Sequence, residues 1–193
     1  SSLCNSHCSI YFWYSMFYLY EEKKLCSTLL ISPPGCGKTT LLRDIIRMVS
    51  DGNRLAGGMT VGVVDERSEL AGCCDGIAVN DLGMRTDILD GCLKAAGMLL
   101  RSMAPDVVAV DELGDREDTT ALEQVLKCGC SVLATVHGGS YEELSRKRFL
   151  QPLLQAGAFQ RYLVLKHCDG TFFVEQVRDG DGQLLASGLA CCA

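Results

Sequence analysis

Apolar and polar positions divide the chain, from residue 27 onward, into alternating strand-like and helix-like segments. Short apolar runs predict strands, and longer segments whose apolar residues recur with the helical period predict helices. The strands are expected at 27–31, 59–64, 106–110 and 130–136, and the longer helices at 41–50, 86–103 and 117–127. Strands that alternate with helices indicate an α/β domain with a mainly parallel, doubly wound sheet.

The last third of the chain does not continue the alternation of strands and long helices. Short helices are expected at 141–147 and 152–157, and two strands at 161–167 and 171–177, on either side of Cys-Asp-Gly, predict a C-terminal β-hairpin. The helix predicted at 86–103 could be capped by Thr86 or by Asp87, because both side chains can accept a hydrogen bond from the first turn. The sequence does not choose between them.

The start of the chain differs in composition from the rest. Residues 10–20 hold seven of the thirteen aromatic residues. This segment is too short to cross a bilayer, which takes about twenty apolar residues, and it lacks the basic leader and small-residue cleavage site of a signal peptide. We therefore expect an aromatic-rich head of uncertain structure at 1–25 and one domain at 26–193, in a cytoplasmic protein.

Charge and cysteine content exclude several classes of protein. The net charge of −6 gives no general attraction to DNA, RNA or anionic lipid, so a nucleic-acid partner is not expected. The twelve cysteines include no C-x-x-C pair, and the chain has only three histidines, so zinc ribbons and c-type haem sites are excluded. We interpret most of the cysteines as small buried residues of a reducing compartment.

Residues 32–40, SPPGCGKTT, match the phosphate-loop pattern G-x-x-x-x-G-K-[ST] except at the first position, where serine replaces glycine. The expected strand precedes the motif and the expected helix follows it. Gly35 and Gly37 allow consecutive backbone N–H groups to face one anion, and the start of the helix adds partial positive charge. This context predicts a site for the phosphates of a nucleoside triphosphate and for Mg²⁺.

Each residue of the loop has an expected part in that site. Lys38 would contact the β- and γ-phosphates, Thr39 would bind Mg²⁺, and Thr40 would reach the α-phosphate. The replacement of the first glycine should have a mild effect, because the two prolines that follow already fix the exit from the strand. The nucleotide-binding residues are expected to be Ser32, Pro33, Pro34, Gly35, Cys36, Gly37, Lys38, Thr39 and Thr40.

Two apolar runs end in the same acidic pair, Asp-Glu, at 65–66 and at 111–112. Both runs should be strands parallel to the strand before the phosphate loop. Ligands of such sheets bind at the carboxyl ends of the strands, so both pairs should face the bound phosphates. For the first pair, carboxylates that are merely solvated remain the alternative.

Residues 99–140 resemble the core of the type II and type IV secretion ATPases and pilus retraction motors. That family has an LR…PD turn before its Walker B strand and a later strand that ends in T-x-H, here at 135–137. VVDERSEL at 63–70 is similar to the aspartate box of the family. Further similarity, in SPPGCGKTTLLRDIIR, NDLGMRTDILDGC and ATVHGGSYEELSRK, is to a branch that acts in sporulation. The resemblance covers about residues 27–167, without the N-terminal domain that members carry ahead of the phosphate loop.

The resemblance implies a RecA-like P-loop ATPase and gives roles to residues outside the loop. Asp111 would hold Mg²⁺, and Glu112 would orient or deprotonate the attacking water. Glu66 or Glu69 would help to place that water, and His137 would sense the γ-phosphate or bond to Glu112.

The resemblance also implies a ring hexamer that is held at the membrane by membrane proteins of a secretion-like sporulation complex. A neighbouring subunit could then supply an arginine finger, for which Arg85 and Arg101 are the first candidates and Arg67 and Arg116 the next. Two other functions remain open: a nucleic-acid-associated ATPase, and a scaffold that binds ATP with little turnover. The preferred base is not apparent from the sequence.

Overall fold

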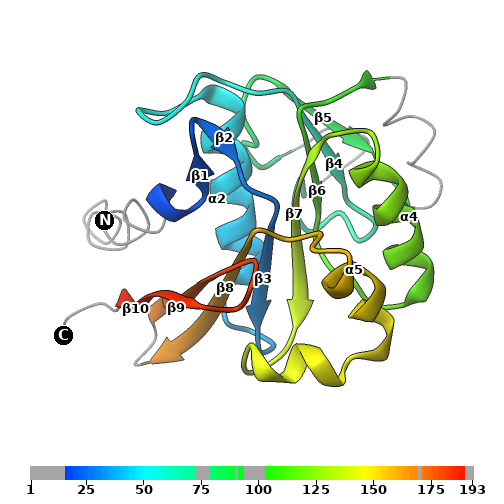
Figure 1. Ribbon diagram of the computed structural model, residues 1–193. Helices are drawn as coiled ribbons and strands as arrows, with labels where there is room; N and C mark the ends of the chain where they lie inside the picture. Colours follow the sequence, from blue (N-terminus) through cyan, green and yellow to red (C-terminus); the bar gives the residue numbers. More distant parts are fainter. Residues whose placement is uncertain (1–15, 73–78, 90, 94–102, 169–170, 190–193) are drawn as a thin grey trace.

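The computed structural model describes residues 16–72, 79–89, 91–93, 103–168 and 171–189. Its main sheet has the strand order β10-β9-β8-β3-β7-β6-β4-β5. The strands from β8 to β5 in this order are parallel to one another, and β9 and β10 are antiparallel (Figure 1). The strands are β3 Thr28–Ser32, β4 Val61–Val64, β5 Thr86–Leu89, β6 Val107–Val110, β7 Ser131–His137, β8 Arg161–Cys168, β9 Thr171–Asp179 and β10 Leu184–Leu189.

Helices cover both faces of this sheet, which confirms the predicted architecture. On one face lies α2, and on the other lie α4, α5 and two short 3-10 helices (Figure 1). None of these helices is long and apolar enough to cross a membrane. Their bounds are α2 Lys38–Asp51, α4 Arg116–Leu126, η1 Glu142–Arg146, η2 Arg148–Leu150 and α5 Gln151–Gln155.

Alternation along the strands creates a separate core on each face. In β3, Leu30 packs in the same cluster as α2, whereas Leu29 and Ile31 pack in the cluster of α4 and α5. All three side chains are fully buried. Strands that are buried on both faces read as continuous apolar runs, which is why the sequence predicted them well.

The prediction of a helix from residue 86 is wrong at its beginning. Thr86–Leu89 is the edge strand β5, parallel to β4, with Val61 opposite Thr86 and Val64 opposite Leu89. Neither Thr86 nor Asp87 is therefore a helix cap; the Thr86 hydroxyl donates to the carbonyl of Leu82 at 2.7 Å. Pairing with β4 outweighs the local helical pattern. Residues 94–102 of the predicted helix lie outside the described residues.

Part of the aromatic head packs on the domain. Met16 and Leu19 are fully buried in the core on the α2 face, and the short strands β1 Tyr20–Glu21 and β2 Lys24–Leu25 follow them. Arg161, only 7% exposed at the start of β8, donates from Nε to the Tyr18 carbonyl at 2.6 Å and pairs through Nη2 with Glu21. This arginine joins the head to the first residue of a central strand.

Replacement of Arg161 should therefore loosen the head. We expect Arg161→Met to lower the free energy of unfolding by about 2 kcal/mol, because it removes charged hydrogen bonds from a buried site. Glu21→Gln is the matched control: it keeps the bond to the Tyr18 carbonyl and should cost less than about 1 kcal/mol, since Glu21 is largely exposed. Urea denaturation measures both, and equal losses would contradict this account.

Candidate functional site

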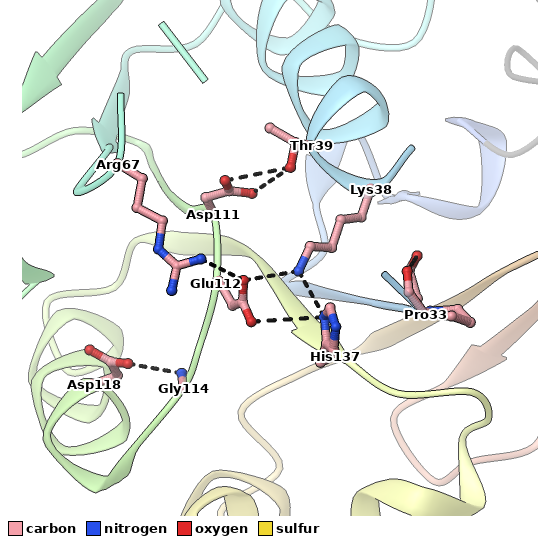
Figure 2. A network of polar contacts seen from close by, with 10 residues as sticks. Pro33, Lys38, Thr39, Arg67, Asp111, Glu112, Gly114, Asp118 and His137 are labelled. Atoms are coloured by element: carbon pink, nitrogen blue, oxygen red, sulfur yellow. Dashed lines mark hydrogen bonds and ion pairs between the residues drawn. The ribbon is translucent and has the colours of Figure 1, made fainter. Parts of the chain in front are cut away.

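Three neighbouring strands deliver the predicted site residues to one edge of the sheet. The phosphate loop leaves β3, His137 ends β7, and Asp111 and Glu112 follow β6. The parallel register places Ser32 directly opposite His137, and β6 runs beside β7 with Val110 opposite Ala134. These side chains meet in one polar network (Figure 2).

The phosphate loop has the backbone that its glycines require. Gly35 and Gly37 have φ angles of 70° and 71°, in the left-handed region that side chains disfavour, and Gly37 is the N-cap of α2. Ser32 instead lies in the extended backbone of β3, where glycine is not needed. Its buried hydroxyl donates to the Pro33 carbonyl at 2.8 Å, so serine at this position is accommodated without strain.

Glu112 lies at the centre of the charged network. Lys38 Nζ donates to Glu112 Oε2 at 3.1 Å and lies 3.1 Å from His137 Nδ1. Arg67 Nη1 lies 3.5 Å from Glu112 Oε2, and His137 Nδ1 lies 3.8 Å from Glu112 Oε1 (Figure 2). Lys38, which is expected to contact phosphate, is thus paired with Glu112, which is expected to orient the attacking water.

The position of Glu112 is fixed by backbone contacts on its C-terminal side. The Leu113 N–H donates to the Thr135 carbonyl of β7 at 2.9 Å. The Gly114 N–H donates to Asp118 Oδ2, also at 2.9 Å, within a capping box in which Asp115 caps α4 (Figure 2). The segment after β6 is therefore held by both β7 and α4.

The surroundings set the pKa of Glu112 below its usual value. Burial alone would raise this pKa, but the hydrogen bond and charge of Lys38, with smaller effects of His137 and Arg67, more than offset burial. Because the folded pKa is below the unfolded value near 4.5, Glu112 stabilises the fold above that pH. This contribution is lost as the pH falls through the folded pKa.

Asp111 lies beside Thr39 of the phosphate loop. Thr39 Oγ1 donates to Asp111 Oδ1 at 3.2 Å, and burial raises the pKa of Asp111, partly opposed by this hydrogen bond. A hydroxyl and a half-buried carboxylate, side by side, are the oxygen ligands that Mg²⁺ takes from a protein when phosphates and water supply the rest. The donor set therefore fits Mg²⁺. The described residues contain no cluster of three side chains that could hold a metal by themselves.

The two acidic pairs differ in structure. Asp65 is 1% exposed, and its carboxylate accepts the N–H groups of Glu69 at 2.9 Å and Ala71 at 2.8 Å. Arg43 of α2 holds the same loop by donating to the carbonyls of Glu69 and Leu70. Asp65 thus shapes the loop after β4, whereas Asp111, the first residue of the other pair, faces Thr39.

Glu66 and Glu69 are both exposed on this loop. Glu69 is close enough for its charge to raise the pKa of Asp111. Glu66 and Arg67 line a cavity of about 320 Å³ that also contains Asp111 and Glu112. The loop after β4 therefore faces the same edge as the second acidic pair, and its positions are compatible with the role predicted for it.

The arginine candidates lie in different places. Arg67 contacts Glu112, and Arg116 is exposed at the first turn of α4. Arg85 directly precedes β5, and its Nη1 donates to the Ser50 carbonyl near the C-terminal end of α2, away from the phosphate loop of its own chain. Arg101 lies outside the described residues. The sequence did not predict three contacts of this region: that of Arg67 with Glu112, those of Arg43 with the loop after β4, and those of Asp65 within that loop.

The remaining loop residues have the exposure expected for a ligand-binding surface. Pro34 and Thr40 are exposed, and Pro33 and Cys36 are half-buried. Cys36 is a free thiol.

Comparison with known proteins identifies the family. A family model described as sporulation stage III, protein AA matches residues 10–185. The chain belongs to the stage III sporulation protein AA family. Stage III sporulation protein AA of Bacillus subtilis (strain 168) is 45% identical over 179 residues, which are 91% of this chain and 58% of the relative. The chain thus spans less than two thirds of the length of that relative.

Solved structures show which fold the family shares. The ATPase DotB of Legionella pneumophila matches with a TM-score of 0.57 and 16% identity, over 80% of this chain and 46% of DotB. The pilus retraction motor PilT, solved with bound ADP, matches with a TM-score of 0.55 and 14% identity, over 79% of this chain and 46% of PilT. The family member described here therefore has the RecA-like fold of secretion ATPases, as predicted.

Lys38 contacts Glu112 more closely than Arg67 does, so Lys38 should lower the pKa of Glu112 more than Arg67 does. Without nucleotide and Mg²⁺, Lys38→Met should raise the pKa of Glu112 clearly, because it removes both a hydrogen bond and a charge. Arg67→Gln should raise it less, since Arg67 is 67% exposed and its interaction is screened by solvent. Carbon-13 NMR titration of the Glu112 carboxyl measures both shifts. A larger shift in the arginine variant would refute the assigned order.

Proposed function

We propose that the chain is the catalytic domain of a Mg²⁺-dependent ATPase. The observation that carries the proposal is the convergence of Lys38, Glu112 and His137 at the carboxyl ends of three adjacent parallel strands, with the Thr39–Asp111 pair beside them. A lone phosphate-loop match would support nucleotide binding only. The added carboxylate and histidine at the same edge are what a hydrolytic site requires.

The phosphates of ATP enter the loop between β3 and α2. The N–H groups around Gly35 and Gly37 and the start of α2 attract the negative charge, and Lys38 exchanges its partner Glu112 for phosphate oxygen. Thr39 and Asp111 would hold Mg²⁺, which neutralises phosphate charge when bound. Relatives support this assignment: PilT was solved with ADP.

Departure of Lys38 changes the properties of Glu112. With Lys38 beside it, the carboxylate has a lowered pKa and is a weak base. Once Lys38 turns to the phosphates, Glu112 loses its strongest stabilising partner, and its pKa rises towards the range in which a carboxylate accepts a proton more readily. Nucleotide binding thereby prepares Glu112 to orient and deprotonate the attacking water.

His137 contacts both Lys38, which moves to the phosphates, and Glu112, which activates the water. Its Nδ1 lies 3.1 Å from Lys38 Nζ and 3.8 Å from Glu112, so any movement of either partner changes its contacts. Because His137 ends β7, its displacement acts on the segment that begins with Gly138 and leads to η1. In the proposed mechanism, this segment transmits the state of the nucleotide to the rest of the protein.

The proposed working form is a ring oligomer in the cytoplasm, attached to membrane proteins of a secretion-like complex during sporulation. Membership of the sporulation family and the secretion-ATPase fold support this context. Arg85, which faces away from the phosphate loop of its own chain, and Arg101 remain candidates to reach the site of a neighbouring copy. Such a shared site makes turnover depend on association.

Phosphate release from ATP tests the proposal. Specific activity should require Mg²⁺ and should rise with protein concentration, and Lys38→Ala and Glu112→Gln should each reduce it by about a hundredfold or more. Lys127→Ala, an exposed lysine at the end of α4, is the matched control and should retain activity. ATP binding without phosphate release at any concentration would favour the nucleotide-gated scaffold instead.

A further inference from the structure

The β8–β9 hairpin extends past the strand that leads into the phosphate loop. β8 pairs with β3 from Thr28↔Arg161 to Ile31↔Val164 and then continues to Cys168, whereas β3 ends at Ser32. Its partner β9 returns antiparallel, with His167 opposite Phe172. The far end of the hairpin therefore lies at the sheet edge where the phosphate loop begins (Figure 1).

The ring of Phe172 rests directly on the phosphate loop. A Cβ atom placed on Gly37 would lie 2.8 Å from both Cγ and Cδ2 of Phe172, which is closer than two carbon atoms approach. The ring thus occupies the space that a side chain at Gly37 would take. It contacts the backbone at the residue that caps α2 and follows the phosphate-binding turn.

The ring is also held in place and partly open to solvent. His167 contacts it with ring centroids 5.2 Å apart and an interplanar angle of 49°. Phe172 nevertheless remains 39% exposed. Single exposed apolar residues are common and need no explanation. What distinguishes Phe172 is that its ring, supported on one side by His167, lies against Gly37 in the loop that would hold the phosphates of a nucleotide.

We propose that Phe172 stacks against the base of the nucleotide bound by the phosphate loop. This inference rests on the proposed function and adds the recognition of the base to it. A nucleotide whose phosphates lie in the loop must place its base outside the loop, where the flat apolar face of the base needs a partner. An aromatic ring fixed beside Gly37 offers such a face without polar groups.

Stacking of this kind has a defined consequence for specificity. Every base has a π-face, so an aromatic ring increases affinity for all nucleotides with little preference among them. The contact therefore strengthens binding of ATP and GTP alike and contributes nothing to the binding of inorganic phosphates. This difference separates base stacking from a role of Phe172 in merely shaping the loop.

Binding of ATP, GTP and inorganic tripolyphosphate, measured by calorimetry, tests the proposal. Phe172→Ala should weaken ATP and GTP by about tenfold and leave tripolyphosphate unchanged, and Phe172→Trp should retain wild-type affinity for all three. The matched control is Phe173→Ala, because adjacent residues of a strand point to opposite faces. This control should leave all three affinities unchanged.

Other outcomes overturn the proposal in distinguishable ways. An equal loss for ATP and tripolyphosphate in Phe172→Ala would mean that the ring only shapes the loop. Unchanged affinities for all three ligands would place the base elsewhere. Lys38→Ala serves as the reference, since it should weaken ATP and tripolyphosphate together. If the wild-type protein bound neither ligand, the proposed ATPase function itself would fail along with the base contact.

Discussion

The parallel pairing of β3, β7 and β6 is the constraint on which the site depends. Because these strands run in the same direction and adjoin one another, three segments that are far apart in the sequence end at one edge. A shift of one residue in register would move every side chain of a strand to the other face of the sheet. The buried apolar residues on both faces therefore fix the register, and with it the distance between Lys38 and Glu112.

The charges at this edge are balanced by contacts within the protein. Lys38 is paired with Glu112 and lies near His137, and the Asp111 carboxylate accepts a hydrogen bond from the hydroxyl of Thr39. In the proposed mechanism, Lys38 exchanges Glu112 for a phosphate oxygen of the nucleotide, and the Asp111 carboxylate would hold Mg²⁺. The groups that pair with one another at this edge are therefore those that the proposed reaction uses.

The phosphate loop and the central parallel strands could be predicted because each is encoded by a short, continuous stretch of sequence. The phosphate loop is a spacing of glycines, lysine and threonine, and each buried parallel strand is a continuous apolar run, so both can be recognised without knowledge of distant contacts. Asp111 and Glu112 were proposed as site residues because they follow such a run, whereas His137 was proposed from the resemblance to secretion ATPases. The resemblance to secretion ATPases added their expected roles.

The features that were missed depend on contacts between distant segments. Thr86–Leu89 is a strand because it pairs with β4, and the local sequence pattern does not predict that pairing. Asp65 has the same sequence context as Asp111 but is turned into the loop that it supports. Phe172 lies 135 positions from Gly37, the difference of their residue numbers, and reaches it only through the pairing of β8 with β3.

In the proposed mechanism, Glu112 competes with the nucleotide for Lys38. The most direct test is the dissociation constant of ATP for Glu112→Gln and for the wild-type protein, measured without Mg²⁺. If the account is correct, the variant binds ATP more tightly, because the neutral side chain holds Lys38 less strongly and repels the phosphates less. Equal or weaker binding by the variant would contradict it.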